Sequence, residues 1–463
     1  MRFPYAEVEI ESTGAIHDEN QRRAASDLVA ATGPTDVLVL CHGWNNDIPQ
    51  ARRLYLRLTD NMAAVRPAVP SAASRSLVVI GVLWPSIRWS DEDEVAGGGA
   101  GFGDEAAALT DAIAERIEDP TRAARLARLV PKLTGSAQAR REFLDALREQ
   151  VPTAPARLTS EVGAEDSGAE GRRASGSGAE DSGAEDSGAE VDEDPPPAAL
   201  LAGDPEEVFA EAGGPEVDFG LPERSGGAAG FDVGPPEQRS AGGAAGFGFG
   251  LDDVLRRARG LLNITTYYTM KDRAGQVGSG GIAALLSALA TTAPQARLHL
   301  AGHSFGARAV SAAAVRHPSL HSCTLLQAAF SHHAFAANFN GRGENGFFRP
   351  LLASRRLTGP MLITHTVNDR AVGLAYAAAS RLARHAGAGL GDENDPYGGL
   401  GRNGALKTPE VVQPGGELLD VGGVYHFQAG RVHNLRADSF VRSHGDVGGQ
   451  QTAYALLGAI NSA

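Results

Sequence analysis

The fold of this chain is decided by residues 297–316, RLHLAGHSFGARAVSAAAVR. The first five residues are a short, largely apolar run that predicts a buried strand, and the alanine-rich stretch from Phe305 onward predicts a helix. Between them stands GHSFG, a G-x-S-x-G motif. In this setting it predicts a tight strand-to-helix turn that presents the hydroxyl of Ser304 at the edge of a sheet, with small residues at Gly302 and Gly306 to permit the strain. The pentapeptide alone is weak evidence, so the prediction depends on its flanks.

Two further apolar runs predict neighbouring strands. Residues 36–41, DVLVLC, and residues 76–84, SLVVIGVLW, are apolar almost throughout, as is typical of parallel strands buried on both faces. Residues 49–66 lie between them and predict a helix with Pro49 at its start. This strand–helix–strand order is typical of a doubly wound, mostly parallel α/β sheet. The alternation continues, with strands expected at 3–11, 322–328, 360–366 and 421–427 and helices at 371–384 and 447–460.

The middle of the chain interrupts this alternation. Residues 1–90 and 251–463 are interpreted together as one discontinuous α/β domain. Residues 91–150 predict a helical insertion, a candidate lid, because Ala, Leu, Arg and Glu recur at helical spacing from 104 on. Residues 151–250 are acidic and rich in Gly and Ala, with the pentad GAEDS three times. Such a composition cannot bury enough apolar surface to offset chain entropy, so we predict a disordered segment before the strand-to-helix turn.

Composition and charge exclude several classes of protein. The net charge is −14, yet 21 acidic residues and three arginines lie between 161 and 237, so the rest of the chain is near neutral. No basic stripe for nucleic acid is evident. We find no run of 18 apolar residues and no secretory signal, so we expect no membrane span. The two cysteines, Cys41 and Cys323, lie in apolar runs, which predicts buried thiols and a reducing cytoplasm.

The chemistry of Ser304 requires two partners. A serine hydroxyl is a poor nucleophile at neutral pH and needs a base in hydrogen-bond reach and an acid that orients that base. Asp369 follows the expected strand 360–366 and is the favoured acid, although an aspartate there can also cap a helix. Asp438 is the alternative acid. For the base, we favour His444, which stands in a short polar loop before the final helix, over two competitors, His433 and His426.

Two backbone N–H groups are also needed to stabilise the negative charge that develops on an attacked carbonyl. One is expected from Phe305, directly after the serine, and the other from Trp44, with Gly43 allowing close approach. His42 is expected to brace that loop. We expect no metal and no cofactor, because the histidines show no H-E-x-x-H pattern and the adjacent His332 and His333 would face opposite ways on a strand.

Four segments in this order, LVLCHGW, LHLAGHSFGAR, ITHTVND and SHGDV, resemble the α/β-hydrolase superfamily. The closest likeness is to little-characterised bacterial serine hydrolases of the esterase and lipase kind. The resemblance implies an α/β-hydrolase fold in which Ser304 is the nucleophile, His444 the base and Asp369 the orienting acid. It also implies that the amides of Trp44 and Phe305 form the oxyanion hole.

These observations predict a cytoplasmic serine hydrolase that cleaves a carboxylic ester of a small molecule through an acyl-enzyme. The same three residues would serve a peptidase, a thioesterase or an acyltransferase, so those activities stay open. A second interpretation is a non-catalytic scaffold that presents its acidic segment to a basic protein partner.

Overall fold

A computed structural model describes residues 1–44, 46–86, 105–152, 195–212, 251–372 and 398–462. Within these residues, eight strands form one sheet in the order β1-β3-β2-β4-β5-β6-β8-β7, and each neighbouring pair is parallel. The strands are β1 (Tyr5–Glu9), β2 (Asp36–Cys41), β3 (Leu77–Leu83), β4 (Arg297–His303), β5 (Ser322–Leu326), β6 (Met361–His365), β7 (Gly416–Glu417) and β8 (Val432–Arg436). The expected α/β class with a mostly parallel sheet is therefore confirmed.

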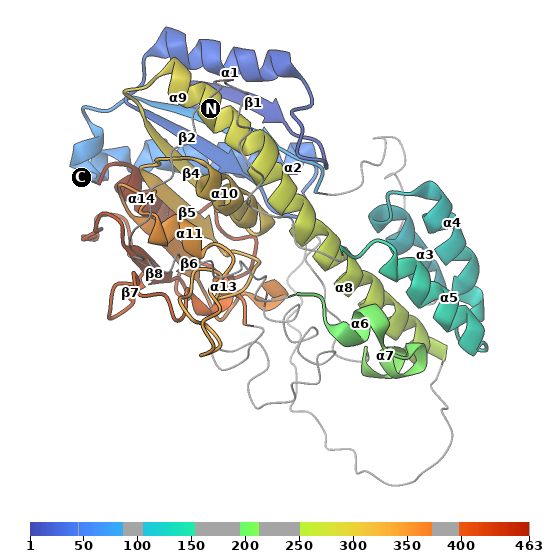
Figure 1. Cartoon of the computed structure of the whole chain (residues 1–463). Coiled ribbons are helices and arrows are strands. Elements are labelled where there is room, and N and C mark those ends of the chain that lie inside the picture. The colour runs from blue at the N-terminus through green and yellow to red at the C-terminus, as the bar shows by residue number, and fades with distance from the viewer. Residues whose placement is uncertain (45, 87–104, 153–194, 213–250, 373–397, 463) are drawn as a thin grey trace, which may run out of the picture.

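Helices cover both faces of this sheet (Figure 1). Successive side chains of β2 point to opposite faces, so Val37 and Val39 join one apolar core and Leu38 and Leu40 join another. This explains why the strand is apolar at consecutive positions. On the first face lie α1 (Glu19–Thr32), α9 (Ala283–Thr292) and α10 (Phe305–Arg316), and on the second lie α2 (Ile48–Val65) and α14 (Gln450–Ile460).

One expected strand is wrong. Residues 421–427 form no strand, and the strand in this region is β8, a few residues later. Gly422 adopts a φ of 94°, which places a turn where an extended chain was expected. The aromatic rings of Tyr425 and Phe427 stack on each other with their centroids 4.7 Å apart. The apolar and aromatic residues that suggested a strand thus pack within a loop, and Tyr425 also contacts Tyr454 of α14.

A single long helical rod leads to β4. Helix α8 (Leu251–Val277) continues through the π-helical turn η4 (Gly278–Ile282) into α9. A Cβ at Gly278 would collide with the backbone of Ala309 in α10, so glycine allows the rod to cross α10 in close contact. This crossing buries every residue from Phe305 to Val315, which is consistent with the many small side chains of α10.

Within the described residues, one helix, Asp253–Thr292, is long and apolar enough to cross a membrane. Its most apolar window has a mean hydropathy of 1.2 and is half buried within the protein. Buried core helices of soluble proteins share this length and composition, so the finding is weak evidence for a membrane span.

The expected helical insertion contains α3 (Glu105–Arg116), α4 (Pro120–Leu129) and α5 (Ala137–Arg148), which pack beside the first half of α8 (Figure 1). Two short helices, α6 (Ala198–Ala202) and α7 (Pro205–Glu211), join them. For these residues the expectation of disorder across 151–250 is wrong. Asp204 caps α7, and Val208 and Phe209 are buried against the insertion. The rest of that range lies outside the described residues, as do all three GAEDS pentads.

Candidate active site

Ser304 stands at a strained turn between β4 and α10. Its φ of 57° and ψ of −123° are rare for a residue with a side chain. A Cβ at Gly302 would collide with the backbone of Gly306, and a Cβ at Gly306 would collide with the carbonyls of Cys41 and His42. Both glycines of the motif are therefore required for the strand and helix to approach so closely. The predicted strand-to-helix turn is confirmed.

The structure brings Ser304, His444 and Asp369 into one hydrogen-bonded row. The Oγ of Ser304 lies 2.8 Å from Nε2 of His444, and Nδ1 of His444 lies 2.9 Å from Oδ2 of Asp369. The three residues come from loops at the carboxyl ends of β4, β8 and β6, which meet at one edge of the parallel sheet. Ser304 and Asp369 are buried, whereas 19% of the His444 side chain is exposed.

Asp369 makes the contacts that both expected roles require. Its Oδ2 faces the imidazole, while its Oδ1 accepts a hydrogen bond from the backbone N–H of Val372 at 3.0 Å, as a helix cap does. A carboxylate accepts but cannot donate, so the proton of His444 is assigned to Nδ1. Nε2 then presents a lone pair to the serine hydroxyl. The helix expected at 371–384 lies outside the described residues beyond Val372.

The alternative residues do not join this row. Asp438 accepts hydrogen bonds from Oγ1 of Thr366 at 2.8 Å and from the N–H of Val367 at 3.1 Å, so it fixes the loop that carries Asp369. The ring of His433 accepts from the N–H of Gln428 at 3.0 Å. His426 is exposed in the loop that replaces the expected strand. The structure therefore brings the favoured histidine and aspartate, and not these alternatives, beside Ser304.

The two expected oxyanion donors flank the serine. Phe305 is the first residue of α10, and the first N–H groups of a helix have no acceptor within that helix. A Cβ at Gly43 would stand 2.6 Å from Cβ of Ser304, so the loop after β2 touches the serine and tolerates only glycine there. The rings of Trp44 and Phe305 lie 5.9 Å apart. The roles of the two amides in a reaction remain predictions.

His42 braces the loop, as expected. Its Nδ1 donates to the carbonyl of Gly43 at 3.0 Å, and its Nε2 accepts from the N–H of Trp84 at 3.2 Å. The backbone N–H of His42 itself donates to the hydroxyl of Tyr55 at 2.8 Å. Burial lowers the pKa of His42 to about 4, so the ring is neutral near pH 7 and acts through these bonds.

One residue beside the row escaped the sequence analysis. His303 precedes the serine, and its Nε2 lies 2.9 Å from the backbone carbonyl of His444. The two imidazole rings lie 4.9 Å apart. Only its place inside the GHSFG motif could have drawn attention to it, because the contact depends on where a loop 141 residues later returns.

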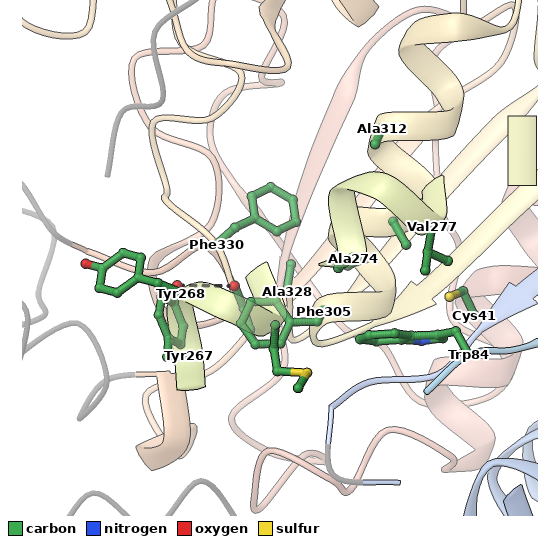
Figure 2. Close-up of a cluster of buried hydrophobic side chains, with 14 of the residues drawn as sticks. Cys41, Trp84, Tyr267, Tyr268, Ala274, Val277, Phe305, Ala312, Ala328 and Phe330 are labelled. Atoms are coloured by element: carbon green, nitrogen blue, oxygen red, sulfur yellow. Dashed lines mark hydrogen bonds between the residues drawn. The ribbon is translucent and has the colours of Figure 1, made fainter. Parts of the chain in front are cut away.

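Aromatic residues from α8 pack against the serine turn (Figure 2). The rings of Tyr267 and Phe305 lie 5.2 Å apart, and the hydroxyl of Tyr267 lies 3.5 Å from the carbonyl of Ala329. Phe330, from the loop after β5, lies near them in the same apolar cluster. The long rod thus links the helical insertion to the immediate surroundings of Ser304. That α3, α4 and α5 act as a lid remains a prediction.

Neither a metal nor a disulfide is indicated within the described residues. No group of three or more His, Cys, Asp and Glu side chains is placed to hold a metal ion there. The rings of His332 and His333 lie 4.1 Å apart, because these residues sit in a turn and not on the strand that would have separated them. Cys41 and Cys323 are free, and burial raises the pKa of Cys323 to about 12. The expected buried thiols are confirmed.

No known protein family, no curated protein and no solved structure matches this chain. The fold class and the geometry of the three loops are therefore the basis for any functional conclusion.

Proposed function

We propose that this protein is a serine hydrolase of the α/β-hydrolase fold that cleaves a carboxylic ester through an acyl-enzyme. The observation that carries the proposal is the row from Ser304 through His444 to Asp369, with separations of 2.8 and 2.9 Å. Such distances allow proton transfer from the hydroxyl to the imidazole without rearrangement. The strained turn at Ser304 supports it further, because strain of this kind is retained mainly where a functional residue must be presented.

In this proposal each group has a step. As Oγ of Ser304 attacks the ester carbonyl, its proton passes to Nε2 of His444, and the imidazolium is stabilised by the carboxylate of Asp369. His444 then returns the proton to the leaving alcohol, and an acyl group remains on the serine. Water attacks this acyl-enzyme with His444 again as the base, which releases the acid and restores the serine.

Negative charge on the attacked oxygen needs fixed donors. The amide of Phe305 is held at the start of α10, where the helix dipole also favours an anion. The second donor in this proposal is the amide of Trp44. Removing one such donor in other hydrolases costs roughly 10²- to 10³-fold in turnover, so the position of the Gly43 loop also affects the rate, although less than the row itself.

The first experiment tests the nucleophile with a fluorophosphonate probe, which reacts covalently with an activated serine. We expect the wild type to be labelled and Ser304→Ala to remain unlabelled. Ser322→Ala is the matched control, because Ser322 also contacts an imidazole but is fully buried in β5. This control should label like the wild type. A wild type that fails to label would favour the scaffold interpretation.

A second experiment defines the acyl group and the leaving group. We expect hydrolysis of p-nitrophenyl esters, and a series of rising acyl length would separate a short-chain esterase from a lipase. A matched p-nitroanilide and a thioester of the same acyl group would reveal a peptidase or a thioesterase. Faster turnover of either compound than of the ester would overturn the ester assignment while leaving the nucleophile in place.

A further inference from the structure

We propose that His303 is a positioning residue for the reaction, one that holds the His444 loop in register with Ser304 through its Nε2–H bond to the His444 carbonyl. This inference rests on the proposed function. It concerns a residue that stands inside the G-x-S-x-G motif, where the sequence gives no reason to expect a role.

The first argument is the direction of the contact. A carbonyl oxygen can only accept, so Nε2 of His303 must carry the proton that bridges the 2.9 Å to the His444 carbonyl. His303 is the last residue of β4 and is directly bonded to Ser304 in the chain. The bond therefore ties the backbone of the base to the backbone of the nucleophile, and a shift of one would move the other.

The second argument is how little else joins the backbone of this loop to the sheet. Apart from the carbonyl bond just described and the two side-chain bonds of His444 to Ser304 and Asp369, the hydrogen bonds of the described residues 442–446 run within the loop or to α2. Asp446 donates its N–H to the carbonyl of Ser443 at 3.1 Å, and Oδ1 of Asp446 lies 3.5 Å from the guanidinium of Arg57. Arg57 is exposed, so this second link is weak. His303 provides the buried anchor.

The third argument is that His303 cannot serve as a base itself. Its Nδ1 is buried and has no hydrogen-bond partner among the described residues, and a Cβ on Gly43 would lie 3.0 Å from it. Burial, reinforced by the nearby His444, lowers the pKa of His303 to about 3. The ring therefore stays neutral beside His444 and does not repel the imidazolium that forms during the reaction.

The anchor has a kinetic consequence. A base displaced by about 1 Å from its nucleophile can lose roughly 10²-fold in rate without any loss of substrate binding. We therefore expect removal of the Nε2 donor to lower kcat and to leave KM nearly unchanged. A purely structural role would lower stability without this selective effect.

The experiment compares His303→Phe with His303→Gln. Phenylalanine keeps a planar ring and removes the donor, whereas the side-chain amide of glutamine can place an N–H near the position of Nε2. We expect His303→Phe to lower kcat and the rate of fluorophosphonate labelling by roughly ten- to one-hundredfold. His303→Gln should recover most of that loss. His321→Gln is the matched control, because His321 is a buried histidine at the other end of the sheet.

The outcomes separate this inference from the proposed function. If the wild type is labelled and His303→Phe is labelled at the same rate, the positioning role is overturned and the hydrolase stands. If His303→Gln is as slow as His303→Phe although both melt near the wild-type temperature, the donor is not what matters and the inference also fails. If the wild type is not labelled at all, the proposed function fails and takes this inference with it.

Discussion

The sheet carries two rows of serine, histidine and aspartate, one at each end. At the carboxyl ends of the strands stand Ser304, His444 and Asp369. At the amino ends, Nδ1 of His299 lies 2.8 Å from Oγ of Ser322, and its Nε2 lies 2.9 Å from Oδ1 of Asp36. The distances are nearly the same in the two rows, so distance alone does not distinguish a candidate active site from a structural network.

The two rows differ in their access and in their backbone. In the amino-end row, Asp36, His299 and Ser322 are buried and lie on β2, β4 and β5 with ordinary strand geometry. Arg75 and Arg297 also bind the carboxylate of Asp36. Burial raises the pKa of Asp36, but the hydrogen bonds from His299 and Arg75 outweigh this effect. They hold the pKa well below its ordinary value. This carboxylate is saturated with partners and closed to substrate.

The carboxyl-end row has the opposite features. Its residues stand on loops, its serine has a strained backbone, and its histidine is partly exposed. Loops at the carboxyl ends of a parallel sheet are where ligands bind in open α/β proteins. Presentation and access therefore set the proposed catalytic row apart, whereas the amino-end row joins strands β2, β4 and β5. Each of the following experiments tests this division.

The largest effect is expected from the two serines. Ser304→Ala should reduce ester turnover by roughly 10⁴- to 10⁶-fold, because it removes the nucleophile from a unit that works together. Ser322→Ala should leave kcat within about twofold and cost about 1 kcal/mol of stability for the lost hydrogen bond. Initial rates with a p-nitrophenyl ester measure the turnover, and urea unfolding measures the stability. Equal loss of turnover in the two variants would remove the distinction between the rows.

The next effect concerns the two aspartates. Asp369→Asn should lower kcat by roughly 10⁴-fold, because an amide there favours the wrong tautomer of His444. Asp36→Asn should leave kcat intact and lower the free energy of unfolding by about 3 kcal/mol, because it leaves two arginines without a buried counter-ion. Steady-state kinetics measure kcat, and denaturant titration measures the free energy of unfolding. An active Asp369→Asn variant with normal kcat would contradict the assigned acid.

A smaller effect is expected at Gly43. Its added Cβ would stand 2.6 Å from Cβ of Ser304, so Gly43→Ala must displace the loop that carries Trp44. We expect a loss in kcat of roughly 10²-fold, the cost of misplacing an oxyanion donor. Gly135→Ala is the control, because a Cβ there meets nothing within 4 Å. Unchanged kcat in Gly43→Ala would show that this loop does not supply a donor.

These comparisons also show what the sequence can predict. The serine turn and the confirmed strands followed from local patterns, because apolar runs and obligatory glycines are properties of neighbouring residues. Asp369 and His444 were found by their order along the chain and their positions after strands. The amino-end row was not predictable, since the contact between His299 and Ser322 depends on the register of β4 and β5.

The failures have a similar origin. Residues 421–427 are rich in the valine and aromatic side chains that strands favour, but the rings find partners within the loop and on α14, so tertiary packing overrides the local pattern. Helix α7 is short and lies in an acidic stretch, and it forms because Val208 and Phe209 meet the insertion. His303 was missed because its partner is a backbone carbonyl, which no side-chain pattern can reveal.

The smallest expected effect is a loss of folding stability at low pH. Burial lowers the pKa of His299 below the ordinary value of 6.5 and lowers that of His42 to about 4. The unfolded chain therefore binds more protons than the folded protein below pH 6.5, so stability is full above that pH and falls as the pH drops. At pH 5 the free energy of unfolding should be lower by about 2 kcal/mol for a fully buried histidine such as His42, at 1.36 kcal/mol per pH unit.

Urea unfolding at pH 7.5 and pH 5 measures this loss for the wild type and for His299→Gln. Glutamine cannot titrate, so the variant should lose less free energy of unfolding between the two pH values than the wild type does, even though it starts from a lower stability. His426→Ala is the control, because His426 is exposed and its removal should leave the difference unchanged. Identical losses in the wild type and in His299→Gln would mean that the histidine of the amino-end row is not held neutral by burial, and the view of that row as a closed structural network would have to be abandoned.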